Sequence, residues 1–168
     1  MQKGQIGEAW DAYDGDFGLI PGVTLIRGQT MPEGLYHLVC CAIVRHRDGE
    51  YLLMRRDGQK TFGGIWEATA GGSALRGETP LECVARELRE ETGIVPDSFT
   101  ELGRDRDDAH HALFVEYLCL TDQDKDSVVV QPGETTAWRW VSRSELFDMP
   151  RGELLSQHML MYVRQGKA

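Results

Sequence analysis

The chain has 168 residues, of which 41% are hydrophobic and 27% are charged, as in an ordinary globular domain. Its formal net charge of −9 argues against binding to a nucleic-acid polymer, because no basic patch stands out that would replace the counterions of phosphates. No apolar run reaches the roughly 18 residues of a membrane span, and the first residues, MQKGQIGEAW, lack a signal peptide's apolar region. The composition therefore predicts a cytoplasmic protein with no membrane partner.

The cysteines support the same compartment. None of them has a CxxC spacing, and all lie inside apolar or helical stretches: Cys40, Cys41, Cys83 and Cys119. This pattern favours reduced, buried thiols over disulfides, and the spacing argues against a zinc site.

Residues 1–35 are predicted to form an N-terminal extension packed on a main domain of residues 36–168. Turn signals at Pro21-Gly22 and around Pro32 separate two expected short strands, at residues 8–14 and 22–28. The aromatic residues of this segment are expected to pack on the domain or on a partner subunit. Exchange of these strands between two copies would give a homodimer.

The main domain reads as a mixed α+β pattern. Residues 36–44 form an apolar run typical of a strand covered on both faces, and a turn at Asp48-Gly49 leads to a returning strand at 51–54. Further strands are expected near 99–106, 112–120 and 135–141. A short helix is expected from residue 142, and an amphipathic closing helix is marked by Leu154, Leu155, Met159 and Tyr162.

The helix between residues 79 and 93 carries the chemistry. Thr79-Pro80-Leu81-Glu82 predicts a capped start, and Gly93 predicts the left-handed residue at its end. At about 100° per residue, one face is expected to meet the core: Leu81, Val84, Ala85, Leu88 and Thr92. The other face carries Glu87, Glu90 and Glu91, with Cys83 among them. Like charges this close repel, whereas a hard divalent cation would turn them into a binding site.

The stretch from Gly72 to Ile94 also reads G-x(5)-E-x(7)-R-E-U-x-E-E-x-G-U, where U is a bulky aliphatic residue. In this the chain resembles the Nudix hydrolases over about residues 36–163. The resemblance implies an α+β fold, an α/β/α sandwich around a mixed sheet. It also implies hydrolysis of a nucleoside diphosphate linked to a group X, with Mg²⁺ or Mn²⁺ as the cofactor and a small-molecule nucleotide or other diphosphate as the substrate.

The resemblance assigns roles to particular residues. Glu90 and Glu91 are expected to bind the cation, and Glu87 is either a third ligand or the general base. The carbonyl of Gly71 and the loop residue Glu134 are further candidate ligands. Arg86 completes the catalytic set by pairing with Glu78 or Glu90, while Gly72, Glu78 and Gly93 are structural. The candidates for binding substrate phosphates are Arg55, Arg56 and Lys60.

Two alternatives remain at this point. The run that ends in KTFGGIW resembles the Nudix branch containing isopentenyl-diphosphate isomerase, which carries a catalytic cysteine a few residues after this tryptophan. Aligned on Trp66, that position is Gly71, and the sequence interpretation is that no thiol lies near the substrate. The other alternative is a non-catalytic module that binds a nucleotide, although such modules usually lose the carboxylates that are all present here.

Overall fold

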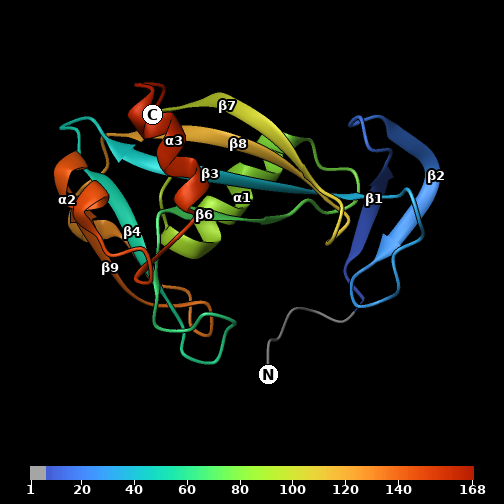
Figure 1. The fold of residues 1–168 in the computed structure, drawn as a ribbon, viewed down its shortest axis with the longest axis horizontal. Coiled ribbons are helices and arrows are strands. Elements are labelled where there is room, and N and C mark those ends of the chain that lie inside the picture. Colours follow the sequence, from blue (N-terminus) through green and yellow to red (C-terminus); the bar gives the residue numbers. More distant parts are fainter. Residues whose placement is uncertain (1–6) are drawn as a thin grey trace.

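The computed structural model describes residues 7–168, and its elements form one mixed sheet, a separate hairpin and three helices (Figure 1). The hairpin strands are β1 (Ala9–Tyr13) and β2 (Leu19–Ile26). The sheet strands are β3 (His37–His46), β4 (Tyr51–Arg56), β5 (Trp66–Glu67), β6 (Thr69–Ser73), β7 (Ser98–Asp107), β8 (Ala112–Thr121), β9 (Thr135–Val141) and β10 (Leu154–Leu155). The helices are α1 (Pro80–Thr92), α2 (Arg143–Asp148) and α3 (Leu160–Arg164), with 3₁₀ turns at Lys125–Ser127 and Gln157–Met159.

Strand β3 is the centre of the sheet. On one side it runs parallel to β8 along its whole length, from His37 to His46. On its other side it pairs antiparallel with β6, and only Arg45, near its end, pairs with β4. Strand β4 continues the sheet to β5 and β9, so β4 and β6 occupy different stretches of the same edge of β3. Residues of β3, β4 and β6 line the pocket described below.

The two faces of the sheet are covered by different helices, which confirms the predicted α/β/α sandwich with a mixed sheet. The apolar run of β3 serves both faces because successive side chains alternate. Cys40, Ala42 and Val44 pack with Val84 and Leu88 of α1. The opposite face carries Ile43, Leu53 and Leu118, which pack with residues of α2 and α3. In Figure 1 α1 lies on one side of the sheet and α3 on the other.

Helix α1 has the predicted ends but a rotated buried face. Thr79 and Glu82 form the capping box, and Gly93 ends the helix with φ 73°. Leu81 is 50% exposed, so its predicted place in the core is wrong. Cys83, expected on the acidic face, is instead fully buried, and its thiol donates to the carbonyl of Gly72 at 3.5 Å. The buried face of α1 therefore includes Cys83, which contacts β6, and excludes Leu81.

The β1–β2 hairpin stands beside the end of the long sheet strands (Figure 1). It is tied to the sheet by a reciprocal pair of backbone hydrogen bonds between Tyr13 and Tyr36, at 2.9 and 3.0 Å, and by the Trp10 ring stacked 4.2 Å from the His37 ring. Strand β2 starts at Leu19, three residues before its predicted start, because the pairing register jumps at Pro21-Gly22 and the Pro-Gly signal marks an irregularity inside the strand. The division into residues 1–35 and 36–168 stays a prediction.

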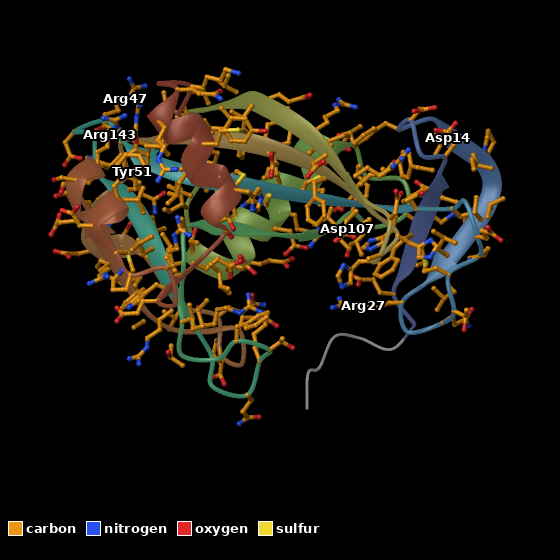
Figure 2. The ribbon with its side chains drawn as sticks, viewed as in Figure 1. Asp14, Arg27, Arg47, Tyr51, Asp107 and Arg143 are labelled. Carbon is orange, nitrogen blue, oxygen red and sulfur yellow. The ribbon has the colours of Figure 1, made fainter. Side chains whose placement is uncertain are left out.

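The predicted closing helix begins too early. Leu154 and Leu155 form β10, which pairs in parallel with β5, and Ser156 with φ 61° separates this strand from the helical segment. The apolar spacing therefore belongs to two buried elements. The end of the chain is fixed where Tyr51 donates to the Ala168 carbonyl at 3.0 Å, and Arg143 donates to Val163 nearby (Figure 2). Across residues 7–168, no helix is long and apolar enough to cross a membrane.

Candidate active site

The acidic face of α1 lies against the glycine segment of β6. Glu91 accepts a hydrogen bond from the backbone N–H of Gly71 at 3.0 Å. Glu87 lies over Gly72, where an added Cβ would come within 2.7 Å of its carboxylate. Glu90 is half exposed at the rim. Gly72 therefore lets the strand approach the Glu87 carboxylate more closely than any side chain would permit, while Gly71 contacts Glu91 through its backbone N–H.

Arg86 connects the helix to the loop that precedes it. Its Nε and Nη2 donate to the two oxygens of Glu78 at 2.6 and 2.9 Å, and Nη2 also donates to the Ser73 carbonyl at 3.2 Å. A further bond of 2.7 Å joins its Nη1 to Glu87. The guanidinium lowers the pKa of the Glu78 carboxyl. Of the two predicted partners, Glu78 receives the bidentate pair, while Glu90 lies 3.4 Å away.

The half-buried carboxylates of Glu87 and Glu91 are electrostatically unfavourable as anions. Burial, followed by repulsion from Glu87, raises the pKa of Glu91 to about 8, and burial also raises the pKa of Glu87. Lys60 has its pKa lowered, first by burial and then by the charge of Arg56. Additional positive charge placed beside Glu87 and Glu91 would oppose the burial penalty on their charged forms.

Two adjoining cavities open at these residues. The more polar one has a volume of about 280 Å³ and is lined by Glu87, Glu90 and Glu91 of α1. The second, of about 170 Å³, lies along β3, β4, β5 and β6. Both are lined by Val39, Lys60, Gly71, Glu91 and Glu134. The shared residues join the two cavities into one bipartite pocket.

The other predicted residues divide around this pocket. Glu134 lies in it and forms an ion pair with Lys60. Arg56 lines the smaller cavity and donates to Glu67 at 2.6 Å. Arg55 is exposed, lines neither cavity and donates to the Gly64 carbonyl at 3.1 Å. Neighbouring residues of a strand point to opposite faces, so β4 presents only one of its two arginines to the pocket.

Sequence reasoning missed several residues that line the pocket. Glu8 and Arg27 come from the hairpin and form an ion pair of 3.0 Å at the polar cavity. Figure 2 shows Arg27 on the side of the hairpin that faces the body of the molecule. The smaller cavity adds Glu67, Thr69, Phe114, Ser156 and His158. No spacing in the sequence relates the hairpin residues to the α1 segment, because the fold alone brings them together.

The cysteines of the described chain are free thiols, and one of them lies at the pocket. Cys41 stands opposite Gly71 in the β3–β6 register and lines the smaller cavity. The interpretation that no thiol lies near the pocket is therefore wrong, because it considered only the position aligned with the isomerase cysteine. Position 71 itself has no room for a side chain, since a Cβ there would lie 2.2 Å from the Cys40 carbonyl oxygen. Burial raises the pKa of the Cys41 thiol.

A metal site is not preassembled. Within residues 7–168, no three His, Cys, Asp or Glu side chains are grouped closely enough to hold a metal ion. Arg86 instead pairs with Glu87 and Glu90. The donor chemistry still fits a hard divalent cation, because carboxylate oxygens line a polar cavity over a glycine that leaves them room.

An acidic helix that an arginine holds against a glycine segment of a mixed sheet is typical of hydrolases acting on phosphoric anhydrides, the class to which the named pyrophosphohydrolase relatives belong. The NUDIX domain profile matches residues 35–162, and the chain belongs to the Nudix family. Members of this family generally use divalent metal ions.

Individual relatives agree with this membership. An uncharacterized Nudix hydrolase of Listeria monocytogenes is 32% identical over 143 residues, covering 83% of this chain and 82% of its own. An isopentenyl-diphosphate Delta-isomerase of Corynebacterium diphtheriae is 36% identical over 88 residues, but the match spans only 52% of this chain and 48% of that protein. The crystal structure of DR0079 from Deinococcus radiodurans superposes with a TM-score of 0.72 at 20% identity, covering 94% and 98% of the two chains.

Proposed function

We propose that the protein is a divalent-metal-dependent pyrophosphohydrolase that cleaves the diphosphate of a nucleoside diphosphate linked to a group X. The observation that carries the proposal is the placement of Glu87 and Glu91, two half-buried carboxylates against Gly71 and Gly72 in a polar cavity of about 280 Å³. Burying two like charges side by side costs stability, and such a cost is typical of a functional site. A module that only bound a nucleotide would have no use for this arrangement.

The proposed cation site consists of Glu90 and Glu91, with Glu87 as a third ligand or as the base that accepts the proton of water. The Gly71 carbonyl and Glu134 complete the set. A bound Mg²⁺ or Mn²⁺ supplies Lewis acidity that lowers the pKa of water and neutralises charge on the diphosphate. Arg86 keeps α1 and its preceding loop in register, so that Glu87 and Glu91 stay at the cavity.

Substrate phosphates are assigned to Arg56, at the end of β4, and Lys60, in the loop that follows, because both line the pocket. Each is paired with a carboxylate in the structure, Lys60 with Glu134 and Arg56 with Glu67. Phosphate binding would therefore exchange one anionic partner for another. If Glu134 turns to a cation, Lys60 becomes available to the phosphate at the same time. Arg55 is left out of this assignment because it lies outside the pocket.

The proposed substrate is a small molecule, since the two cavities have volumes of only about 170 and 280 Å³ and the chain has a net charge of −9. We keep the cytoplasmic location and the homodimer as predictions. Gel filtration of the intact chain tests the dimer, and a monomer would contradict it.

A substrate panel tests the activity. The purified protein is incubated with nucleoside triphosphates, dinucleoside polyphosphates, nucleotide sugars and ADP-ribose, with Mg²⁺, with Mn²⁺ or with chelator. We expect cleavage of at least one substrate only when a cation is present, with ¹⁸O from water in one phosphate product. The Glu91→Gln variant should lose at least about a hundredfold in kcat, whereas the control Glu101→Gln, on the exposed face of β7, should retain activity.

The alternatives predict different results in the same assay. Tight nucleotide binding without cleavage would favour the non-catalytic module. The position of Cys41 supports the isomerase alternative, because it supplies a thiol beside the pocket. Conversion of isopentenyl diphosphate by the intact protein, lost in Cys41→Ser, would favour that chemistry. Equal nucleotide cleavage by the intact protein and Glu91→Gln would contradict the metal mechanism.

A further inference from the structure

Strand β8 carries a buried carboxylate that the proposed hydrolysis does not use. Glu116 is only 2% exposed, and it stands in an otherwise apolar strand. One of its oxygens lies 2.8 Å from His158 Nε2, and the other accepts a hydrogen bond from the Tyr162 hydroxyl at 2.7 Å. A buried carboxylate is costly unless it is satisfied in this way, so both partners are part of its arrangement.

The backbone opposite makes room for this arrangement. Strand β7 has an irregularity in its pairing with β8 between Glu101 and Gly103. At Gly103 an added Cβ would lie 2.2 Å from the Tyr162 hydroxyl oxygen, so only glycine leaves space for that hydroxyl. The position of Tyr162, and through it the orientation of Glu116, therefore depends on this glycine. Gly103, Tyr162 and Glu116 therefore form a specific buried arrangement and not a chance contact.

His158 connects this buried site to the active-site pocket. Its side chain is 62% exposed, and it lines the smaller cavity together with Arg56, Lys60 and Phe114. It also lines a neighbouring cavity of about 380 Å³ on the β7–β8 side. Because a carboxylate accepts hydrogen bonds, His158 Nε2 is the nitrogen that donates to Glu116. Nδ1 is therefore the nitrogen left for a contact with the substrate. Within the described part of the chain Nδ1 has no hydrogen-bond partner.

We propose that His158 is a substrate-contacting residue of this site, which binds an anionic oxygen of the group X through Nδ1–H. Glu116 is its positioning residue. The chemistry recognised is a phosphate beyond the diphosphate that is cleaved. This inference rests on the proposed function, because it identifies the class of X that the same pocket prefers.

The surrounding charges decide when the ring can donate from both nitrogens. The groups near it on β7, the turn after it, β8 and α3 are Asp105, Arg106, Asp107, Asp108, Glu116 and Tyr162. The smaller cavity adds Arg56, Lys60, Glu67, Glu91 and Glu134. The hydrogen bond to Glu116 is the main cause of a raised His158 pKa, and Asp105 adds to it. The imidazolium form, which an anion requires, therefore persists to higher pH than in an isolated histidine.

Kinetics with two substrates of the same nucleoside test the proposal. One carries a further phosphate in X, as in a dinucleoside tetraphosphate, and the other has an uncharged sugar. For the first substrate, His158→Gln should raise KM about tenfold with little change in kcat, and for the second it should change neither. The KM of the intact protein for the phosphorylated substrate should rise as pH passes upward through the His158 pKa. Glu116→Gln should move that rise to lower pH.

Two further variants separate a positioning role from a structural one. Tyr162→Phe removes the other hydrogen bond of Glu116 but leaves its contact with His158, so the pH at which KM rises should move less than in Glu116→Gln. His110→Gln changes an exposed histidine that lines none of the three cavities, and it should match the intact protein. Equal KM values and equal pH profiles for the intact protein and His158→Gln would overturn the proposal.

If the protein cleaves no substrate, the proposed function is contradicted but the role of His158 is not. In that case an NMR titration tests His158 directly. Inorganic triphosphate, which carries one phosphate more than a diphosphate, is added to the intact protein while the histidine ring signals are followed, with His158→Gln used for assignment. We expect the His158 signals to move and the triphosphate affinity to fall about tenfold in His158→Gln. Unmoved His158 signals would overturn the proposal.

Discussion

Arg86 donates two hydrogen bonds to the carboxylate of Glu78, at 2.6 and 2.9 Å, across the eight positions that separate them in the sequence. Such a fork-to-fork pair fixes direction as well as distance. It joins the loop before α1 to the middle of the helix. This planar contact therefore holds the loop against the acidic face, beside the bonds that join α1 to Gly71, Gly72 and Ser73.

Replacing Arg86 by Lys keeps the charge but removes the fork. We expect a loss of about 1–2 kcal/mol in the free energy of unfolding, since the contact is half-buried, and a fall of about tenfold or more in kcat. Denaturant unfolding and steady-state kinetics measure the two effects. Arg89→Lys changes an exposed arginine of the same helix and serves as the control. Equal effects of both changes would contradict the role of the pair.

A divalent cation should stabilise the folded protein through Glu91. Binding to the native state alone raises the melting temperature with ligand concentration. We expect a rise in Tm of several degrees at millimolar Mg²⁺ or Mn²⁺, on the order of 1–3 kcal/mol of binding free energy. The rise should be absent in Glu91→Gln and present in Glu101→Gln. Thermal unfolding with and without chelator measures it, and the same rise in Glu91→Gln would exclude this residue as a ligand.

The hairpin residue Arg27 should affect substrate binding. It lines the polar cavity beside Arg86 and Lys60 and is paired only with Glu8 among the ion pairs of the described residues. Arg27→Gln should raise KM by about three- to tenfold while leaving kcat nearly unchanged, because its positive charge would contact phosphate away from the bond that breaks. Arg47→Gln is the control, since Arg47 lies at the opposite end of the molecule (Figure 2). Unchanged kinetics in Arg27→Gln would place the hairpin outside the binding site.

His37 should make stability fall in mild acid. Burial, with a smaller contribution from Arg27, lowers its pKa to about 4, and its Nδ1 has no hydrogen-bond partner within the described residues. Below pH 6.5 His37 binds a proton in the unfolded chain but stays neutral in the folded chain. Stability that is present above pH 6.5 is therefore lost as the pH falls toward 4. The loss is at most about 3 kcal/mol.

The comparison of the intact protein with His37→Phe isolates this contribution from that of the carboxylates. Phenylalanine keeps the ring stacked against Trp10 but does not titrate. The free energy of unfolding, measured at several pH values between 4 and 7.5, should therefore fall more steeply in the intact protein. Parallel curves for the two proteins would show that His37 does not titrate differently on unfolding.

Gly103→Ala should destabilise the protein because the new methyl group would overlap the Tyr162 hydroxyl. We expect a loss of about 1–3 kcal/mol, as for an overpacked core position. Gly152→Ala adds the same group where no atom lies within 4 Å and should cost much less. If Gly103→Ala is combined with Tyr162→Phe, part of the loss should be recovered. Urea unfolding of the three variants measures the difference, and no recovery would mean that the clash lies elsewhere.

The sequence was sufficient to predict the elements whose ends are marked by capping or turn residues. Helix α1 was predicted with its true ends because Thr79, Pro80 and Gly93 act within a few residues of the helix they limit. The β3 run and the Asp48-Gly49 turn were equally clear. The elements near residue 160 were not clear from the sequence. The apolar residues there have a helical spacing, but they belong to a strand at Leu154 and a separate helix from Leu160.

The parts of the pocket assembled over long sequence separations could not be predicted. Arg27 reaches the polar cavity only because the hairpin pairs with Tyr36, and Cys41 reaches the smaller one through the β3–β6 register. Glu116 did leave a signal: a carboxylate inside an apolar strand requires buried partners. The sequence did not identify His158 as a partner, because His158 lies 42 residues further along the chain.

The hairpin is joined to the remainder of the protein by the Tyr13–Tyr36 backbone pair, the Trp10–His37 stack and hydrogen bonds from Arg76 and Gly77, and it supplies Glu8 and Arg27 to the polar cavity. If Arg27 contacts the substrate as predicted, selectivity and bond cleavage would be encoded in separate segments of the gene. Grafting a different hairpin onto the same sheet would offer protein engineers a way to redirect the enzyme toward new substrates while its hydrolytic machinery is inherited unchanged.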